Sequence, residues 1–348
     1  MSPSFSVCLP IRNEASWLAG AIESVLAQTY EDFELLIGDN ASDDGIEGVI
    51  AKFDDPRIVH HRFDDLVLVN ESFNRTVALS SREWVHTLSA DDRMMPYCLE
   101  RIAEQIEKHA DDGVVMVAGA VRRVDEQGKP TDIIEADERQ RRPIPYRAIR
   151  PGLHDARSWL ESNAAEGISP WMFGSVSFRR DIILGTGFYR PDMELCADLE
   201  VAMRVAVYGP VVWIDESLLD YTVRGNSSTL SYILDDLERN NATSMFERAW
   251  SAVLLLHRER RQVSDAEAAV IKAAIARQLL QRALWHRKME TGHGRLAAIR
   301  DVARAAMYSP STMTAPKSIG VALGSIVAPK SVLEKATEIG HRNGTILV

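Results

Sequence analysis

Charged side chains stand at the points where three apolar segments of the sequence end, and their types suit the binding of phosphates and metal ions. The segments are 5–9, 33–38 and 84–88, and the side chains that follow them are Arg12, Glu14, Asp39, Asp91 and Asp92. If the segments are parallel strands, their carboxyl ends meet at one edge of a sheet, where open α/β sheets bind ligands. The spacing therefore predicts one binding edge built from three loops.

Asp91 and Asp92 are the strongest candidates for chemistry. Adjacent carboxylates repel each other, and a divalent cation removes that cost. Mg²⁺ and Mn²⁺ favour one or two carboxylates together with the phosphate oxygens of a substrate. A solvated helix cap before Met95-Pro96 explains the same dipeptide, and five other Asp-Asp pairs occur in the chain. The position after a buried strand is what favours the metal site here.

Other common kinds of site have no pattern in the sequence. Neither the GxGxxG nor the GxxxxGKS phosphate loop occurs. The nine His and three Cys lack metal-ligand spacing. A net charge of -10 argues against a nucleic-acid partner, which needs a basic face. Phosphate is therefore expected to bind through a metal ion and arginine.

The composition is that of a soluble globular protein, with 46% hydrophobic and 26% charged residues. Cys8, Cys98 and Cys196 lie far apart in the sequence, which suits a reducing compartment. The N-terminus lacks the basic start and apolar run of a signal peptide, and the apolar stretch 319–328 is too short to span a bilayer. We predict a cytoplasmic protein, either free or peripheral at the inner face of the plasma membrane.

Short apolar runs alternate with amphipathic patterns over the first two thirds of the chain. The predicted strands are 5–9, 33–38, 58–62, 84–88, 114–120 and 211–214, and 171–178 reads as loop and strand. The predicted helices are 15–28, 46–53, 70–81, 97–109 and 197–208. This alternation is typical of an α/β fold, with a mainly parallel sheet flanked by helices on both faces.

Two later regions lack the alternation. Residues 125–157 are rich in Arg, Asp, Glu and Pro, and we expect a long loop there. After about residue 226, the segments 230–257, 264–288 and 295–307 have helical patterns with no clear strand between them. The expected division is an α/β domain over 1–228 and a helical C-terminal region over 229–348.

Several segments resemble glycosyltransferase family 2, in the order in which that family has them. Residues 6–45 are similar to its opening, with Pro10-Ile-Arg-Asn-Glu14, then Ser24-Val-Leu-Ala-Gln-Thr-Tyr30 and an Asp-rich turn. The series continues through residues 70–92, 173–209 and 214–229. The resemblance implies a GT-A-type, Rossmann-like fold and an inverting transferase that uses a nucleotide sugar.

The resemblance also implies roles for individual residues. Asp39 matches the residue that contacts the nucleobase, and Asp91 and Asp92 match acids that hold ribose, diphosphate and metal ion. Asp198 matches the general base that takes a proton from the acceptor. The residues that match the family's nucleotide-sugar site are Pro10, Arg12, Glu14, Asp39 and Asp91.

Four positions depart from the family pattern. Ser89 stands where an Asp is frequent, and Ala197 removes an acidic neighbour that would raise the pKa of Asp198. Arg12 replaces an aromatic ring that stacks on the base, and a guanidinium plane can stack in its place. Arg224 replaces the His of a late Tyr-x-x-His motif, and its planar charged fork predicts a contact to the diphosphate.

The sequence thus predicts transfer of a sugar from a nucleoside diphosphate sugar to an acceptor hydroxyl. By resemblance, the nucleotide is UDP or dTDP, and the acceptor is a saccharide or lipid-linked saccharide of bacterial polysaccharide or glycolipid synthesis. Trp171 is a candidate for the acceptor site, because sugars pack on aromatic rings, and a loop aromatic folded over the core explains it equally well.

Alternatives stay open for the activity and for the C-terminal helices. A nucleotidyltransferase has a similar fold, although residues 10–16 lack the Gly-rich first loop of that class. An inactive relative would bind nucleotide sugars or serve as an assembly module. The C-terminal helices leave open a second copy of the chain or a membrane surface as partner, and their basic residues are more simply a solvated helix face.

Overall fold

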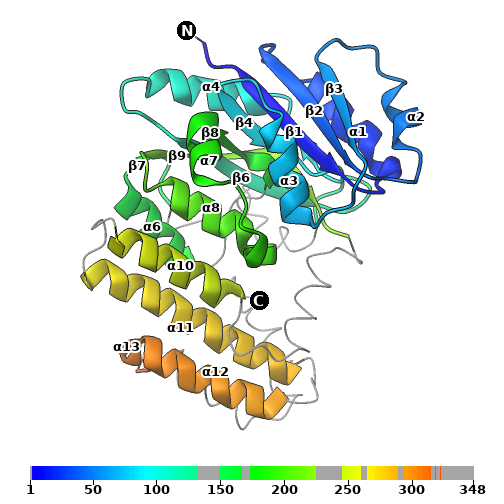
Figure 1. Ribbon diagram of the computed structural model, residues 1–348. Coiled ribbons are helices and arrows are strands. Elements are labelled where there is room, and N and C mark those ends of the chain that lie inside the picture. Colours follow the sequence, from blue (N-terminus) through cyan, green and yellow to red (C-terminus); the bar gives the residue numbers. More distant parts are fainter. Residues whose placement is uncertain are drawn as a thin grey trace. The chain divides into compact units, whose positions relative to one another are not determined.

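The structure is a computed structural model that describes residues 2–131, 149–166, 173–224, 245–259, 265–288, 294–314, 318 and 322 (Figure 1). The chain divides into two compact units. The first contains the described residues up to 131, 149–159 and 173–224, and the second contains 160–166 and those from 245 onward. The boundary expected at residue 228 lies outside the described residues and stays a prediction.

The first unit is built on one sheet of nine strands. They are β1 (Phe5–Ile11), β2 (Phe33–Asn40), β3 (Ile58–Phe63), β4 (Trp84–Thr87), β5 (Arg93–Met94), β6 (Met116–Val124), β7 (Gly152–His154), β8 (Val176–Arg179) and β9 (Val211–Thr222). The order is β3-β2-β1-β4-β8-β6-β9-β5, with β7 also paired to β9. Strands β5, β7 and β8 run against the other six. The predicted α/β fold with a mainly parallel sheet is confirmed.

Helices of the first unit follow the strands of the sheet. They are α1 (Ala15–Leu26), α2 (Ile46–Ile50), α3 (Val69–Ala78), α4 (Cys98–Lys108), α7 (Arg180–Thr186) and α8 (Ala197–Val205), and α6 (Ala156–Glu166) begins in this unit. Every predicted helix is present here, but α6 and α7 were not predicted. The long loop expected over 125–157 is wrong in part, because β7 and the start of α6 lie within it.

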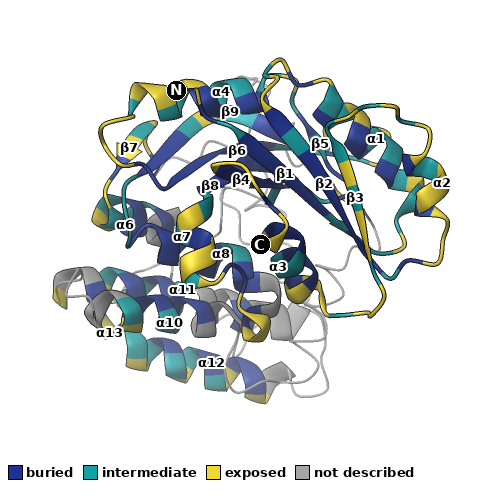
Figure 2. Cartoon of the chain, turned by 45° about the horizontal axis from the view of Figure 1, so that its top comes forward, coloured by how far each residue is buried: buried dark blue, intermediate teal, exposed yellow. Residues whose placement is uncertain are grey.

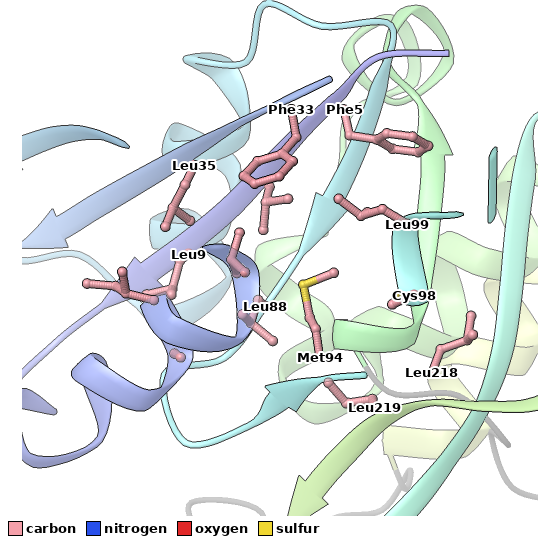
Figure 3. Close-up of a cluster of buried hydrophobic side chains, with 14 of the residues drawn as sticks. Phe5, Leu9, Phe33, Leu35, Leu88, Met94, Cys98, Leu99, Leu218 and Leu219 are labelled. Carbon is pink, nitrogen blue, oxygen red and sulfur yellow. The ribbon is translucent and has the colours of Figure 1, made fainter. Parts of the chain in front are cut away.

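The middle strands of the sheet are buried on both faces (Figure 2). On one face, Phe5 of β1 and Phe33 of β2 pack in an apolar cluster with Leu99 of α4 (Figure 3). On the other face, α3 lies so close to β2 that a Cβ at Gly38 would overlap the side chain of Thr76. Helices therefore cover both faces of these strands.

The second unit is helical in its described part. Its helices are α10 (Met245–Glu259), α11 (Asp265–Lys288), α12 (Gly294–Tyr308) and α13 (Pro310–Met313). The predictions for 264–288 and 295–307 agree with α11 and α12, whereas the part of 230–257 before residue 245 lies outside the described residues. Among the described helices, none has the length and apolar character to cross a membrane.

His86 of β4 is a buried histidine that should make the free energy of unfolding depend on pH. Its Nδ1 lies 2.9 Å from Ser177 Oγ, and its Nε2 lies 3.1 Å from the carbonyl oxygen of Gly174. Burial lowers the pKa of His86 to about 4. The unfolded chain takes up this proton near pH 6.5 and the folded chain does not, so the free energy of unfolding is expected to fall by up to about 3 kcal/mol as the pH drops from about 6.5 to about 4.

Urea unfolding between pH 4 and pH 7 measures this slope. In His86→Gln the contribution of the imidazole disappears, whatever the variant's absolute stability. The exposed His61 of β3 supplies the matched control, His61→Gln, which should keep the wild-type slope. An unchanged slope in His86→Gln would contradict the assignment.

Candidate active site

The loops after β1 and β2 are joined to each other. Asn13 N donates to Ser42 Oγ at 3.1 Å, and Asp43 N donates to Asn13 Oδ1 at 2.9 Å. Asn13 and Ala41 have φ angles of 52° and 57°, in the left-handed region that costs free energy for a residue other than glycine. Both of these strained residues lie in the loops that meet at the predicted binding edge.

Asp91 and Asp92 follow β4 and are fixed by the end of β9. Thr222 N donates to Asp92 Oδ1 at 2.9 Å, and Thr222 Oγ1 donates to the carbonyl oxygen of Asp91 at 2.6 Å. Asp92 is 2% exposed. Burial, and then the charge of Asp91, raises the pKa of Asp92 well above its ordinary value. The positive charges of Arg93 and Arg224 lower this pKa but do not cancel the two effects that raise it.

Arg224 lies against the acidic groups of two loops. Its Nη2 is 2.6 Å from Asp91 Oδ2, and its Nη1 is 3.1 Å from Glu14 Oε2. Its guanidinium carbon is 5.4 Å from the centre of the Trp17 ring on α1. Burial alone would lower the pKa of Arg224, but Glu14 and Asp91 raise it above its ordinary value. The structure thus brings together three of the residues that the sequence singled out.

Asp198 lies in the first turn of α8, where its Oδ1 accepts a hydrogen bond from Leu199 N at 2.7 Å. Burial raises the pKa of Asp198 to about 6. The acidic neighbour that Ala197 removes is not needed for this rise in pKa, because burial causes it. A carboxyl group with a pKa near 6 is suited to accepting a proton close to neutral pH.

Tyr189 connects Asp198 to the end of β4. Burial and then the charge of Asp198 raise the pKa of Tyr189, and its hydroxyl is hydrogen-bonded to Thr87, the last residue of β4. Asn74 of α3 holds the backbone of Tyr189 on both sides, since its Nδ2 donates to the Tyr189 carbonyl at 2.7 Å and its Oδ1 accepts from the Tyr189 amide at 2.7 Å. Asp198 therefore lies near the strand end that leads into Asp91.

Asp39 is fully buried at the end of β2. Its Oδ1 accepts from Ser42 N at 2.8 Å, and its Oδ2 lies 2.6 Å from Nη1 of Arg62. The carboxylate is thus engaged on both oxygens by groups of the protein. Its role in base binding stays a prediction.

The other predicted site residues lie at the same edge or outside the described residues. Pro10 is the residue before the last of β1 and pairs with Gly38 of β2. Arg12 follows β1, with its Nη2 3.7 Å from Asp43 Oδ2. Trp171 lies outside the described residues, so its place as an acceptor contact stays a prediction.

The acidic pair fits a divalent cation that a diphosphate shares. Within the described ranges, no group of three or more His, Cys, Asp or Glu side chains is arranged to hold a metal by itself. Mg²⁺ and Mn²⁺ do not need such a cage, because one or two carboxylates and substrate phosphates suffice. Burial and the charge of Asp91 raise the pKa of Asp92, and a bound cation would lower it again. Asp91 and Asp92 are the residues that would hold the ion.

Arg93 and Thr222 support the acidic pair, and neither was predicted from the sequence as a site residue. Arg93 Nη1 donates to the carbonyl oxygen of Asp92 at 2.7 Å, and its Nη2 donates to that of Trp17 at 3.1 Å. Its guanidinium occupies the place where a Cβ at Gly20 would lie. The position of Arg93 directly after Asp92 could have indicated its role from the sequence. Nothing in the sequence around Thr222 indicates that it bonds to Asp92.

A family model matches the first part of the chain, and curated relatives match part of its length. Residues 6–160 match the model of glycosyl transferase family 2. The PGL/p-HBAD biosynthesis glycosyltransferase of Mycobacterium bovis is 33% identical over 118 residues, which are 33% of this chain and 46% of that protein. The chain spans less than two thirds of the length of the curated relatives it matches.

Two solved structures are similar over most of their length. TarS residues 1–349 of S. aureus align with 97% of this chain and 92% of that one, at a TM-score of 0.59 and 12% identity. The mannosyltransferase PcManGT of Pyrobaculum calidifontis, solved with GDP-Man and Mn²⁺, aligns with 99% of this chain and 84% of that one, at a TM-score of 0.56 and 15% identity. The likeness confirms the predicted GT-A-type fold.

Proposed function

We propose that this chain, in which residues 6–160 carry a glycosyltransferase family 2 domain, transfers a sugar from a nucleoside diphosphate sugar to an acceptor hydroxyl. The observation that carries the proposal is the meeting of Arg224 with Glu14 and Asp91 at the carboxyl ends of β1 and β4. A cation beside two adjacent carboxylates suits a diphosphate that brings a metal ion with it.

The donor would lie across the ends of the strands. Pro10, Arg12 and the Asp39 region form the base end of the site, and Arg224 holds the phosphates at the other end. A bound Mg²⁺ or Mn²⁺ on Asp91 and Asp92 would supply positive charge to the departing diphosphate. UDP or dTDP is the nucleotide we propose, and a structure of TarS with UDP-GlcNAc supports the uridine form.

Asp198 would act as the general base. It takes the proton of the acceptor hydroxyl, whose oxygen attacks the anomeric carbon on the face opposite the leaving diphosphate. One direct displacement of this kind inverts the anomeric centre. The acceptor we propose is a saccharide or lipid-linked saccharide in bacterial polysaccharide or glycolipid synthesis, with Trp171 as a further acceptor contact.

The proposal is tested by calorimetry with UDP in the presence and absence of Mn²⁺. Wild type should bind UDP with Mn²⁺ more tightly than without it, and Asp92→Asn should lose most of that difference while keeping the bond from Thr222 N. Asp111→Asn is the matched control, because Asp111 belongs to an exposed Asp-Asp pair after α4 and should leave binding unchanged.

The outcomes separate the alternatives. A wild-type protein that shows no metal-dependent nucleotide binding would refute the proposed function. Binding of a nucleotide sugar without transfer or hydrolysis, over a screen of donors, would favour an inactive relative that serves as a binding module.

A further inference from the structure

Arg204 of α8 is a buried arginine that bonds three successive carbonyl oxygens of an earlier segment. Its Nη1 donates to the carbonyl oxygens of Thr186 at 3.1 Å and Gly187 at 2.6 Å, and its Nη2 donates to that of Phe188. The Arg204 side chain is 10% exposed. These carbonyls belong to the turn that ends α7, so Arg204 ties this turn to the helix that carries Asp198.

Glu200 neutralises the charge of the buried arginine. Its Oε1 lies 2.9 Å from Arg204 Nε, one turn away on the same helix, and its side chain is 3% exposed. A buried ion pair of this kind adds little to stability, because desolvation of the two charges offsets their attraction. A guanidinium does present its N–H donors in one rigid plane. The pair is therefore better explained by the position that it fixes than by its free energy.

The turn has a backbone angle that suits this arrangement. Gly187 has a φ of 77°, in the region that favours glycine. A Cβ at this position would meet no atom within 4 Å, so only the backbone angle requires a glycine there. The left-handed angle is thus part of the turn in which three successive carbonyls bond one guanidinium.

The same segment is fixed on its other side to α3 and to β4. Asn70 Nδ2 of α3 donates to the carbonyl oxygen of Arg190 at 3.0 Å. The hydroxyl of Tyr189 is hydrogen-bonded to Thr87 at the end of β4. Residues 186–190 therefore connect α8 to the strand that leads into the acidic pair.

We propose that Arg204 is a positioning residue, which holds Asp198 near the end of β4 by locking residues 186–190 to α8. The inference rests on the proposed function, in which Asp198 is the general base. A shift of about 1 Å in such a group can cost roughly 100-fold in rate, even when its cause lies away from the reacting atoms. Arg204 acts on kcat through Asp198 and not on the binding of the donor.

Arg204→Lys tests the inference, because it keeps a charge beside Glu200 and loses the fork that bonds three carbonyls. Turnover is measured with the UDP- or dTDP-hexose on which wild type is most active, and kcat should fall by about 10- to 100-fold. Calorimetry with UDP and Mn²⁺ should give the Kd and the number of binding sites of wild type. An unchanged number of sites excludes a loss of folded protein as the cause.

The protonation of Asp198 gives a second readout that needs no donor. Burial raises its pKa to about 6, and hydrogen bonds from the N–H groups of Leu199 and of Asp198 itself oppose this rise. Carbon-13 NMR of the aspartate carboxyls follows the titration, with Asp198 assigned by its absence in Asp198→Asn. In Arg204→Lys a displaced Asp198 meets more water, so its pKa should fall toward about 4. A loss of stability alone would leave this pKa unchanged.

Gly187→Ala disturbs the same turn without altering the ion pair. Strain at its φ should lower kcat and the pKa of Asp198 in the same direction, and this variant guards against unfolding of Arg204→Lys. Arg180→Lys is the matched control, since Arg180 Nε donates to the carbonyl oxygen of Ser80 at 2.8 Å, before the start of β4. The control should keep the kcat and the Asp198 titration of wild type.

The remaining outcomes are distinct. If folded Arg204→Lys and Gly187→Ala keep the kcat and the Asp198 titration of wild type, Arg204 does not position Asp198. If Arg204→Lys loses affinity for UDP together with kcat, its effect is general and the inference is wrong as well. A wild type that binds no nucleotide refutes the proposed function, whereas the titration of Asp198 still decides whether Arg204 holds this carboxyl group.

Discussion

Replacing Asp198 by Asn is expected to lower kcat by roughly 100- to 10,000-fold, because a positioned general base contributes a factor of that size. The amide cannot accept the proton of the acceptor hydroxyl. Its oxygen can still accept the hydrogen bond that Leu199 N donates to Asp198 Oδ1. The start of α8 should therefore be preserved, and the loss should fall on kcat more than on the KM of the donor.

The same substitution should leave the protein at least as stable as wild type at pH 8. Burial raises the pKa of Asp198 to about 6, above its value of about 4 in the unfolded chain. The folded state therefore binds the proton more tightly, and the wild-type free energy of unfolding falls as the pH rises from about 4 to about 6. Asp198→Asn lacks this penalty, so it should gain about 1 to 2 kcal/mol above pH 6 after allowance for partial exposure.

Two measurements check the assignment. The kcat of wild type should rise with pH through about 6 as Asp198 loses its proton. Asp181→Asn is the matched control, because Asp181 lies in the first turn of α7 and bonds Ile182 N at 2.9 Å in the same way. The control should change neither kcat nor its pH profile. An Asp198→Asn variant with more than about a tenth of wild-type kcat would refute the role of general base.

Replacing Arg224 by Ala should weaken binding of a nucleoside diphosphate by about 10- to 100-fold, because hydrogen bonds between charged groups are lost. It also leaves Glu14 and Asp91 without the cation that they share. Repulsion between these carboxylates and the incoming phosphates adds to the loss. Arg224→Lys should recover part of the affinity, since an ammonium restores the charge without the planar fork.

Calorimetry with UDP and with uridine separates the phosphate contact from the base contact. Arg224→Ala should weaken UDP much more than uridine. Arg179→Ala is the control, because Arg179 pairs with Asp181 and lies opposite Trp84, at the far end of β4 from the site. Equal affinity of wild type and Arg224→Ala for UDP, with turnover intact, would show that Arg224 does not hold the diphosphate.

The strands that carry the site were predictable because their signal is local. β1, β2 and β4 are apolar runs followed by polar turns, and burial on both faces leaves the same pattern in the sequence. Glu14 and Asp91 could be placed at one edge from that pattern alone, since parallel strands end together. Their contact through Arg224 confirms the placement.

Other features of the fold and the site depend on contacts between distant parts of the chain, which a short segment of sequence does not reveal. β5 has two residues and β7 has three, too few to show a period of two, and each exists through its pairing with β9. The ion pair of Arg62 with Asp39 was not predicted, because an arginine in an ordinary strand pattern resembles any solvated side chain. The raised pKa of Asp198 was not predicted, because its cause is burial, which the neighbouring residues in the sequence do not reveal.

The bond between Thr222 and Asp92 has a consequence for the order of synthesis. The two residues are 130 positions apart, so the acidic pair leaves the ribosome long before the strand that anchors it. Until β9 is made, a nascent chain holds the loops of β1, β2 and β4 but neither Thr222 nor Arg224. Residues 6–160, which alone match the family model, therefore form an incomplete site. Premature termination before β9 would yield a fragment that keeps the residues matching the family model and lacks Arg224, the cation that contacts Glu14 and Asp91.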